Sequence, residues 1–180
     1  MKREEVILVD MMDNEIDTME KMEAHRKGAL HRAFSIFIFN SKGEILLQKR
    51  NSEKYHSGGL WSNTCCSHPR PLERLTVAAN RRLYEEMGMK VKLSKAFSFH
   101  YKAELDHDLI ENELDHVFIG FSNDLPEVNP VEVEGYCYVS PETLLIGIDK
   151  HPDEYTEWLK ICFEQLMNYI NKKSYYEKVS

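Results

Sequence analysis

Apolar residues cluster along the first third of the chain in a pattern that predicts strands before any long helix. A short apolar run at residues 6–9 indicates a strand. The more polar stretch 18–28 predicts a loop or a short helix that ends at its final glycine. Residues 31–40, rich in Phe and Ile, and residues 44–50 flank the turn sequence NSKG, so this segment is expected to form a β-hairpin.

Residues 51–71 show no hydrophobic period and are rich in Gly, Ser, His and Pro. This composition predicts a long irregular loop, and loops of this length in compact domains are often functional. The loop contains the motif NTCCSHP at residues 63–69, in which two cysteines are adjacent and a histidine follows Cys66 by two positions. Adjacent thiols suit neither a structural disulfide nor packing, so the motif is a candidate for chemistry.

The clearest helix is predicted at residues 72–88. Apolar residues recur there at every fourth position, and a glycine supplies the stop: Leu75, Ala79, Leu83, Met87 and Gly88. Three further strands are predicted after it, at residues 96–105, 116–122 and 135–140.

Two helices are predicted near the end of the chain. Ser140 followed by Pro141 is typical of a helix start. A final helix over about 153–172 places four apolar residues on one face: Trp158, Cys162, Leu166 and Ile170. Strands that come first and helices that are segregated predict an α+β fold, in which a mixed sheet lies between helices as an α/β/α sandwich.

Composition narrows the class of protein. The chain has 180 residues, 42% of them hydrophobic, which fits one domain over residues 1–180. No apolar run is long enough for a bilayer, and the N-terminal region lacks the features of a signal peptide, so a cytoplasmic protein that does not bind membranes is expected. No exposed heptad pattern demands an oligomer, which favours a monomer.

Charge and cysteine usage limit the partners. A formal net charge of −7 argues against nucleic-acid binding. It allows a small phosphorylated substrate, provided that metal ions and a few local Lys or Arg residues hold the anion. The four cysteines, at positions 65, 66, 137 and 162, are expected to be free thiols or ligands in a reducing cytosol.

Three histidines and an alternating carboxylate pair are candidate metal ligands. Histidine binds transition metals through one neutral ring nitrogen. Glu111 and Glu113 of the sequence ENE would project from one face of a strand. Together with His25, His31 and His68 they could form a five- or six-coordinate site, whereas the simpler alternative is ordinary surface histidines and a solvated strand edge.

The predicted helix and the thiols each have two interpretations. The pairs Arg82–Glu86 and Arg81–Glu85 stand at helical i, i+4 spacing, which favours exposed ion pairs over a site for Mg²⁺ and phosphate. The C-x-H spacing after Cys66 offers two zinc ligands, but no second ligand arm is present. A catalytic thiol in the loop is an equally good interpretation.

These scattered features resemble the Nudix box, G-x₅-E-x₇-R-E-U-x-E-E-x-G-U, where U is bulky and apolar. Ser67, Glu73 and RRLYEEMGM at residues 81–89 match its spacing. Ser67 replaces the glycine, and Arg82 replaces the glutamate after the first arginine. That helix normally gathers several carboxylates around Mg²⁺, so the loss of one argues against ordinary Nudix hydrolysis.

Five motifs together resemble a branch of the Nudix superfamily, the type 1 isopentenyl-diphosphate isomerases. They extend over most of the chain: LHRAFS (30–35), NTCCSHP (63–69), RRLYEEMG (81–88), IENE (110–113) and GID…W (147–158). The combination of NTCCSHP with ENE is specific, whereas the helix alone is not.

The resemblance implies metal and substrate sites, position by position. One divalent metal, Mn²⁺, Zn²⁺ or Mg²⁺, would be ligated by His25, His31, His68, Glu111 and Glu113. A second ion, Mg²⁺, would bind the diphosphate of the substrate with the help of Glu86. The diphosphate itself would be bound by Lys21, Arg50, Lys54 and Arg82.

The resemblance also implies the acid–base residues of the isomerisation. Cys66 and Glu113 would be the two proton-transfer groups, with Tyr101 beside Glu113, and Trp158 would lie near the hydrocarbon. Cys65 is expected only to pack. The alternatives are a Nudix hydrolase of a nucleoside or other diphosphate and a non-enzymatic metal-binding domain.

Overall fold

The computed structural model of the protein describes residues 4–54 and 56–179, and for residues 173–179 it describes the backbone alone. Helices, 3₁₀ turns and strands follow one another in the order β1 (Glu5–Val9), β2 (Glu15–Glu20), α1 (Lys21–Lys27), β3 (His31–Phe39), β4 (Ile45–Arg50), β5 (Trp61–Ser62), β6 (Cys65–Ser67), α2 (Leu75–Met87), β7 (Ser94–Glu104), η1 (Asp106–Asp108), β8 (Ile110–Phe121), β9 (Val133–Val139), α3 (Pro141–Lys150), η2 (Pro152–Glu154) and α4 (Glu157–Val179). Within these described ranges, no helix has both the length and the apolar character needed to span a bilayer.

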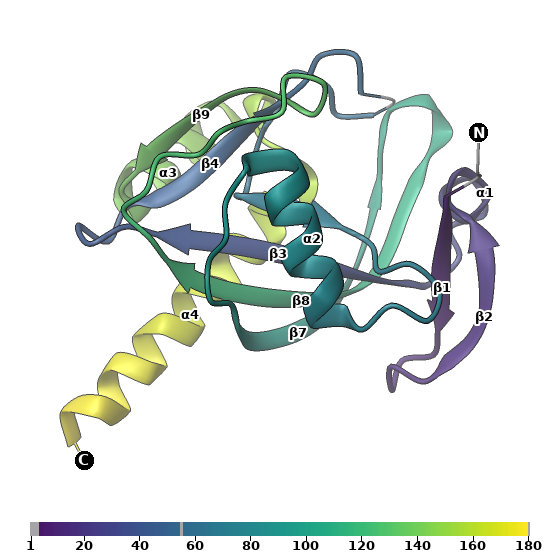
Figure 1. Ribbon diagram of the computed structural model, residues 1–180, viewed down its shortest axis with the longest axis horizontal. Helices are drawn as coiled ribbons and strands as arrows, with labels where there is room; N and C mark the ends of the chain where they lie inside the picture. The colour runs from purple at the N-terminus through teal and green to yellow at the C-terminus, as the bar shows by residue number, and fades with distance from the viewer. Residues whose placement is uncertain (1–3, 55, 180) are drawn as a thin grey trace.

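The strands of the described residues form one mixed sheet with β3 at its centre (Figure 1). β3 pairs in parallel with β8 along its whole length and antiparallel with β6. It meets β1 at its first residue and β4 at its last. β7 extends the sheet beyond β8, while β5 and β9 pair with β4. The parallel pair among antiparallel neighbours makes the sheet mixed, as predicted.

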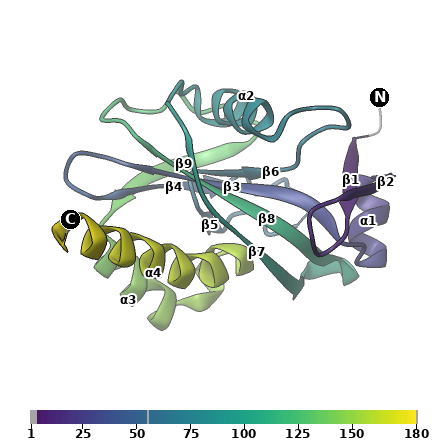
Figure 2. The same cartoon turned by 90° about the horizontal axis from the view of Figure 1, so that it is seen from below.

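Helices cover both faces of this sheet, with α2 on one side and α3 and α4 on the other (Figure 2). Successive side chains of a strand point to opposite faces, so β3 contributes to both cores. Phe34, Ile36 and Ile38 pack with α2, whereas Phe37 and Phe39 pack with α4. A strand buried on both faces needs a nearly continuous apolar sequence, which is the pattern of β3. The α/β/α arrangement is therefore confirmed.

Local sequence signals correctly predicted several element ends. Gly28 and Gly88 cap α1 and α2 in the left-handed conformation, with φ of 60° and 67°. The Ser140 hydroxyl accepts the backbone N–H of Thr143 at 3.1 Å and so caps α3. The apolar faces predicted for α2 and α4 point into the two cores.

The predicted elements differ from the structure in three places. β2 was not predicted, because its side chains are exposed or half-buried and give no apolar alternation. The segment 51–71 is not irregular throughout, since the short strands β5 and β6 pair with β4 and β3. β8 begins at Ile110 rather than at residue 116, so the ENE sequence lies within a strand.

Candidate functional site

One cavity brings together most of the residues that the sequence singled out, and we refer to it as the site cavity. Its lining includes Lys21, Arg50, Lys54, Cys66, His68, Arg82, Glu86, Tyr101, Glu111, Glu113 and Trp158. The remaining two, His25 and His31, are fully buried beside His68 and Glu113. Side chains from both halves of the chain therefore meet at one place.

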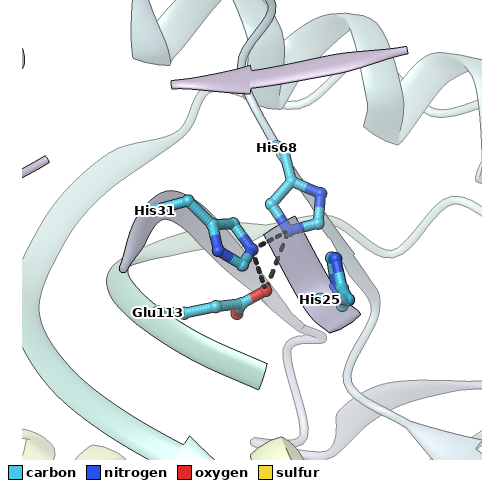
Figure 3. Close-up of side chains that lie close together, drawn as sticks. All are labelled: His25, His31, His68 and Glu113. Atoms are coloured by element: carbon cyan, nitrogen blue, oxygen red, sulfur yellow. Dashed lines mark hydrogen bonds and ion pairs between the residues drawn. The ribbon is translucent and has the colours of Figure 1, made fainter. Parts of the chain in front are cut away.

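Three histidines and one carboxylate converge at one place, where His68 and Glu113 also line the site cavity (Figure 3). His25 comes from α1, His31 from the start of β3, His68 from the segment after β6, and Glu113 from β8. One potential ligand atom from each residue lies within 4.8 Å of those of the others. The predicted metal ligands are thus brought together, and Glu111 lies two residues away on the same face of β8.

Strand register explains why these side chains meet. Glu113 is directly opposite His31 in the parallel β3–β8 pair, and it is opposite Tyr101 in the antiparallel β7–β8 pair. Directly paired residues project to the same face of a sheet. Cys66 is paired with Ser35, four residues along β3 from His31, which places the thiol on the same face. The side chains of Glu111 and Glu113 in the ENE sequence therefore point into the site.

The hydrogen bonds of two histidines determine which ring nitrogen faces the centre. His25 and His31 direct Nδ1 at the carbonyl oxygens of Lys21 and Ala29, at 2.7 and 2.8 Å. A carbonyl oxygen only accepts, so Nδ1 carries the hydrogen in both rings. In a neutral ring Nε2 then carries a lone pair, as it does in metal-binding histidines. His31 Nε2 lies 3.2 Å from His68 Nε2.

Converging lone pairs beside a carboxylate are the donor set of a divalent cation. Burial lowers the pKa of His25, and it lowers the pKa of His68 to about 3, so both rings are neutral at physiological pH. Glu113 Oε1 lies 2.8 Å from His68 Nε2 and 3.4 Å from His31 Nε2. The residues present therefore fit a bound divalent metal.

Glu113 connects the histidine cluster to a tyrosine. Its second oxygen accepts a hydrogen bond of 2.6 Å from the Tyr101 hydroxyl, which also lies 2.9 Å from Glu111 Oε2. Burial opposes ionisation of Glu113, but the adjacent His31 and His68 outweigh it and lower the carboxyl pKa. Burial and the neighbouring Glu113 charge raise the pKa of Glu111. Burial and the charges of Glu111 and Glu113 raise the pKa of the Tyr101 hydroxyl.

The two adjacent cysteines have different environments. Cys65 is fully buried in the core beneath α2. Cys66 points to the other face of the sheet and lines the site cavity. Burial raises the pKa of the Cys66 thiol to about 12. The nearby Arg50 charge lowers this pKa, whereas the charges of Glu86 and the ENE carboxylates raise it further. Cys66 therefore carries a proton at physiological pH.

Four basic side chains line the same cavity. Arg82 contacts Glu86 and lies 2.9 Å from Glu85, and Lys54 contacts Glu132. Arg50 donates to the backbone carbonyls of residues 56 and 57 at 3.2 Å. Lys21 lies 3.1 Å from Glu4. These cations are held at defined positions by carboxylates and backbone, and together they suit a multiply charged anion.

Trp158 belongs both to the core and to the cavity wall. Its side chain is 2% exposed, and the indole N–H donates to Ser62 Oγ at 2.9 Å and to Asn63 Oδ1 at 3.1 Å. The guanidinium carbon of Arg50 lies 5.0 Å from the ring centroid. The indole is thus fixed in place, and its π system already accommodates one cation.

The two ion pairs predicted on α2, Arg81–Glu85 and Arg82–Glu86, both form, but their side chains are less exposed than the prediction of surface ion pairs implied. Arg81 makes a bidentate contact with Glu73, at 2.7 and 2.8 Å, and a further one with Glu85 at 3.1 Å. Glu86 is 4% exposed and accepts from Gln48 Nε2 at 2.9 Å as well as from Arg82. The Nudix-like residues of this helix therefore mainly bind one another.

Two buried polar residues at the site were missed. Asp115 continues the alternation of the ENE sequence and accepts from Ser35 Oγ at 2.7 Å. Burial and the Glu113 charge raise its pKa to about 8. His56 lines the site cavity and is 5% exposed. The alternation could have identified Asp115, whereas nothing in the loop sequence distinguished His56 from a surface histidine.

Known proteins resemble this chain in sequence and in structure. The NUDIX domain family matches residues 29–159. The isopentenyl-diphosphate Delta-isomerase of Pectobacterium atrosepticum is 50% identical over 165 residues, 92% of each chain. An isopentenyl-diphosphate Delta-isomerase 2 of Photorhabdus laumondii is 52% identical over 155 residues, which is 86% of this chain and 88% of the relative.

Solved structures share the fold at low sequence identity. DR0079 from Deinococcus radiodurans superposes with a TM-score of 0.77 at 19% identity, over 90% of this chain and 98% of that one. A MutT protein from Methanosarcina mazei has a TM-score of 0.64 at 19% identity, over 80% and 95% of the two chains. These structures establish the fold, and the closer sequence relatives establish the branch. The chain therefore belongs to the NUDIX domain family and, within it, to the isopentenyl-diphosphate Delta-isomerases.

Proposed function

We propose that this protein interconverts isopentenyl diphosphate and dimethylallyl diphosphate. The main support for the proposal is that two chemically different sets of side chains line one cavity. Four basic side chains and Glu86 suit a diphosphate with Mg²⁺, whereas a thiol, a tyrosine–carboxylate pair and an indole suit a reacting hydrocarbon. An alkenyl diphosphate has the same two parts. The names of the sequence relatives reported above support this substrate class.

The reaction moves one carbon–carbon double bond and needs two proton transfers. A proton adds to the terminal carbon of the alkene, which leaves a tertiary carbocation. Loss of a proton from the neighbouring methylene then forms the internal double bond, so that atoms and charge balance. An alkene is a very weak base, and the acid must therefore be held directly at the carbon that it protonates.

Cys66 and Glu113 are the two proton-transfer groups in this proposal. They line one cavity from different strands, β6 and β8. Burial keeps the Cys66 thiol protonated, with a pKa of about 12, and the neighbouring His31 and His68 lower the pKa of Glu113. One group therefore holds a proton while the other can accept one, and they exchange these states in the reverse reaction. Tyr101 donates to Glu113 and positions it.

The metal at the histidine–carboxylate site would be held by His25, His31, His68, Glu111 and Glu113, as Mn²⁺, Zn²⁺ or Mg²⁺. Such an ion supplies positive charge that relieves the repulsion between two carboxylates and tunes their acidity. A second ion, Mg²⁺, would be shared between the diphosphate and Glu86, because Mg²⁺ prefers oxygen ligands and usually binds few protein groups beside a phosphate. Monomeric state and cytoplasmic location stay predictions.

A hydrolase of another diphosphate is the less well supported alternative. Hydrolysis on this fold uses carboxylates gathered on the Nudix helix. Among the described residues, neither group of converging metal-ligand side chains includes a carboxylate of α2. Glu73 and Glu85 are instead bound by arginines.

The function is tested by incubating the purified protein with isopentenyl diphosphate and Mg²⁺ in D₂O and recording proton NMR spectra. Dimethylallyl diphosphate that contains deuterium, without released phosphate, is the expected result. Released phosphate or pyrophosphate would instead support the hydrolase. The absence of any product from protein with bound metal would contradict both.

Replacement of Arg82 by glutamine is expected to weaken substrate binding. Arg82 lines the cavity from α2, whereas the ENE residues line it from β8. Loss of one charge-assisted contact costs about 1.5–3 kcal/mol, so KM should rise roughly 10- to 100-fold while kcat changes less. Steady-state kinetics would measure this. A KM equal to that of the wild type would contradict the phosphate role.

Replacement of Trp158 by phenylalanine is expected to lower kcat more than it raises KM. A phenyl ring stabilises a cation less well than indole, and cation–π attraction is worth about 0.5–2 kcal/mol, so kcat should fall by roughly 3- to 30-fold. The lost hydrogen bonds to Ser62 and Asn63 also cost stability, so a melting temperature is measured alongside the kinetics. Unchanged kcat in a folded variant would limit Trp158 to packing.

A further inference from the structure

His56 is a buried histidine in the connection between β4 and β5, and the roles above leave it unused. Its ring stacks on His25, with centroids 5.9 Å apart, and meets Trp158 edge-on at 5.8 Å. Its Nδ1 lies 3.2 Å from Ser57 Oγ, while Nε2 lies 3.9 Å from Glu111 Oε1. His56 therefore stands between the histidine cluster and the indole, with Nε2 toward a predicted metal ligand.

His56, His25 and Glu111 form a second group whose potential ligand atoms lie within 4.8 Å of one another. His25 belongs to both groups. Its Nδ1 is directed at the Lys21 carbonyl, so Nε2 is the atom that it can offer a metal. One ring nitrogen binds one ion at a time. The two groups therefore meet at this atom and cannot each hold an ion through it.

We propose that His56 is a sixth protein ligand of the metal at this site, an inference that rests on the metal site of the proposed function. The complete donor set is then His25, His31, His56, His68, Glu111 and Glu113. Six donors suit an octahedral ion, and four imidazoles favour Mn²⁺ or another transition metal over Mg²⁺. Ligands about 2.1 Å from an ion are separated by roughly 3.0 Å when adjacent and 4.2 Å when opposite, so the 3.9 Å between His56 and Glu111 is within reach.

A sixth protein ligand would close the site to water. Structural metal sites are closed by protein ligands, whereas sites that activate water keep a position open. Water held at the wall of this cavity would be a nucleophile close to a carbocation and would convert it to an alcohol. A closed coordination sphere avoids this loss and leaves the ion to fix and polarise the carboxylates.

The test uses the full-length protein, stripped of metal and loaded with one equivalent of Mn²⁺ in the absence of diphosphate. The relaxation rate of water protons reports whether water exchanges in the coordination sphere of the ion. Wild type should show only the small effect of outer-sphere water. His56→Ala should show the larger effect of one bound water and bind Mn²⁺ at least about 10-fold more weakly. His151→Ala, at an exposed histidine, is the matched control and should behave as wild type.

His56→Gln provides a second variant in case the alanine variant unfolds, because the amide oxygen can still approach the ion. It is expected to lie between wild type and His56→Ala in Mn²⁺ affinity. Water in the coordination sphere of the wild type would overturn the proposal, as would equal relaxation and affinity in wild type and both variants. Failure of the underlying metal site looks different, since wild type would then bind no stoichiometric Mn²⁺.

Discussion

Replacement of Cys66 by alanine is expected to abolish nearly all isomerisation while the protein remains folded and retains its metal. Cys66 lines the cavity on β6 and belongs to neither group of converging metal-ligand side chains, so its removal takes away a proton-transfer group and no metal ligand. General acid–base groups contribute roughly 10²- to 10⁴-fold, so kcat should fall by about that factor. Turnover, metal content and a melting curve measured on the same preparation would show it.

Cys65→Ala is the matched control for this experiment. Cys65 has the same side chain one residue away, but it packs in the core beneath α2. Its replacement should cost stability on the order of 1 kcal/mol and leave most of the turnover. If Cys66→Ala kept near-normal kcat, the thiol would not be a proton carrier. If Cys65→Ala lost as much activity as Cys66→Ala, packing around the motif would explain both results.

Hydrophobic pattern predicted the layers of the fold well because both cores depend on it. β3 and α4 carry apolar residues at the positions that face the cores, and such periodicity is visible in a sequence. β2 has no such pattern, since it pairs with β1 at the edge of the sheet and remains largely exposed. Its charged residues suit an edge strand, where they discourage pairing with other chains. A strand without apolar alternation cannot be recognised from the hydrophobic pattern of the sequence.

The polar half of β8 was missed for the opposite reason. Glu111, Glu113 and Asp115 are buried, with at most 6% exposure, on a strand that hydrophobicity alone would begin later, at residue 116. Burial of carboxylates is costly unless hydrogen bonds or a cation compensate it. Local rules fail here because neighbouring elements supply that compensation: His31, His68 and Tyr101. A failed strand prediction at an alternating acidic sequence is thus itself an indication of a site.

The site residues could be named from motifs, but their arrangement could not. Spacing in the sequence does not reveal that His31, Glu113 and Tyr101 share one register across three strands. Sequence spacing also gives no means of telling His56, which lies in a polar loop, from a surface histidine. The same limit applies to α2, where only the structure indicates that the Nudix-like carboxylates are bound by arginines.

Replacement of Glu113 by glutamine is expected to remove both metal affinity and turnover. Gln is isosteric and its oxygen can still accept from Tyr101, so the geometry of the pair is largely kept. The amide cannot ionise, and it places either a weaker donor or an N–H group against His68 and His31. Metal affinity should fall by at least about 10- to 100-fold, and kcat by roughly 10²- to 10⁴-fold.

Addition of excess metal separates the two roles of Glu113. If the carboxylate is both ligand and proton carrier, saturation of Glu113→Gln with Mn²⁺ should restore metal content without restoring turnover. Glu111→Gln is the matched control, because Glu111 shares the Tyr101 hydroxyl and is also a proposed metal ligand, but it is not one of the two proposed proton-transfer groups. Its turnover should recover with metal, since the proton carrier remains. Recovery of Glu113→Gln to the same extent would reduce Glu113 to a ligand, and the second proton carrier would then have to be Tyr101 or another group in the cavity.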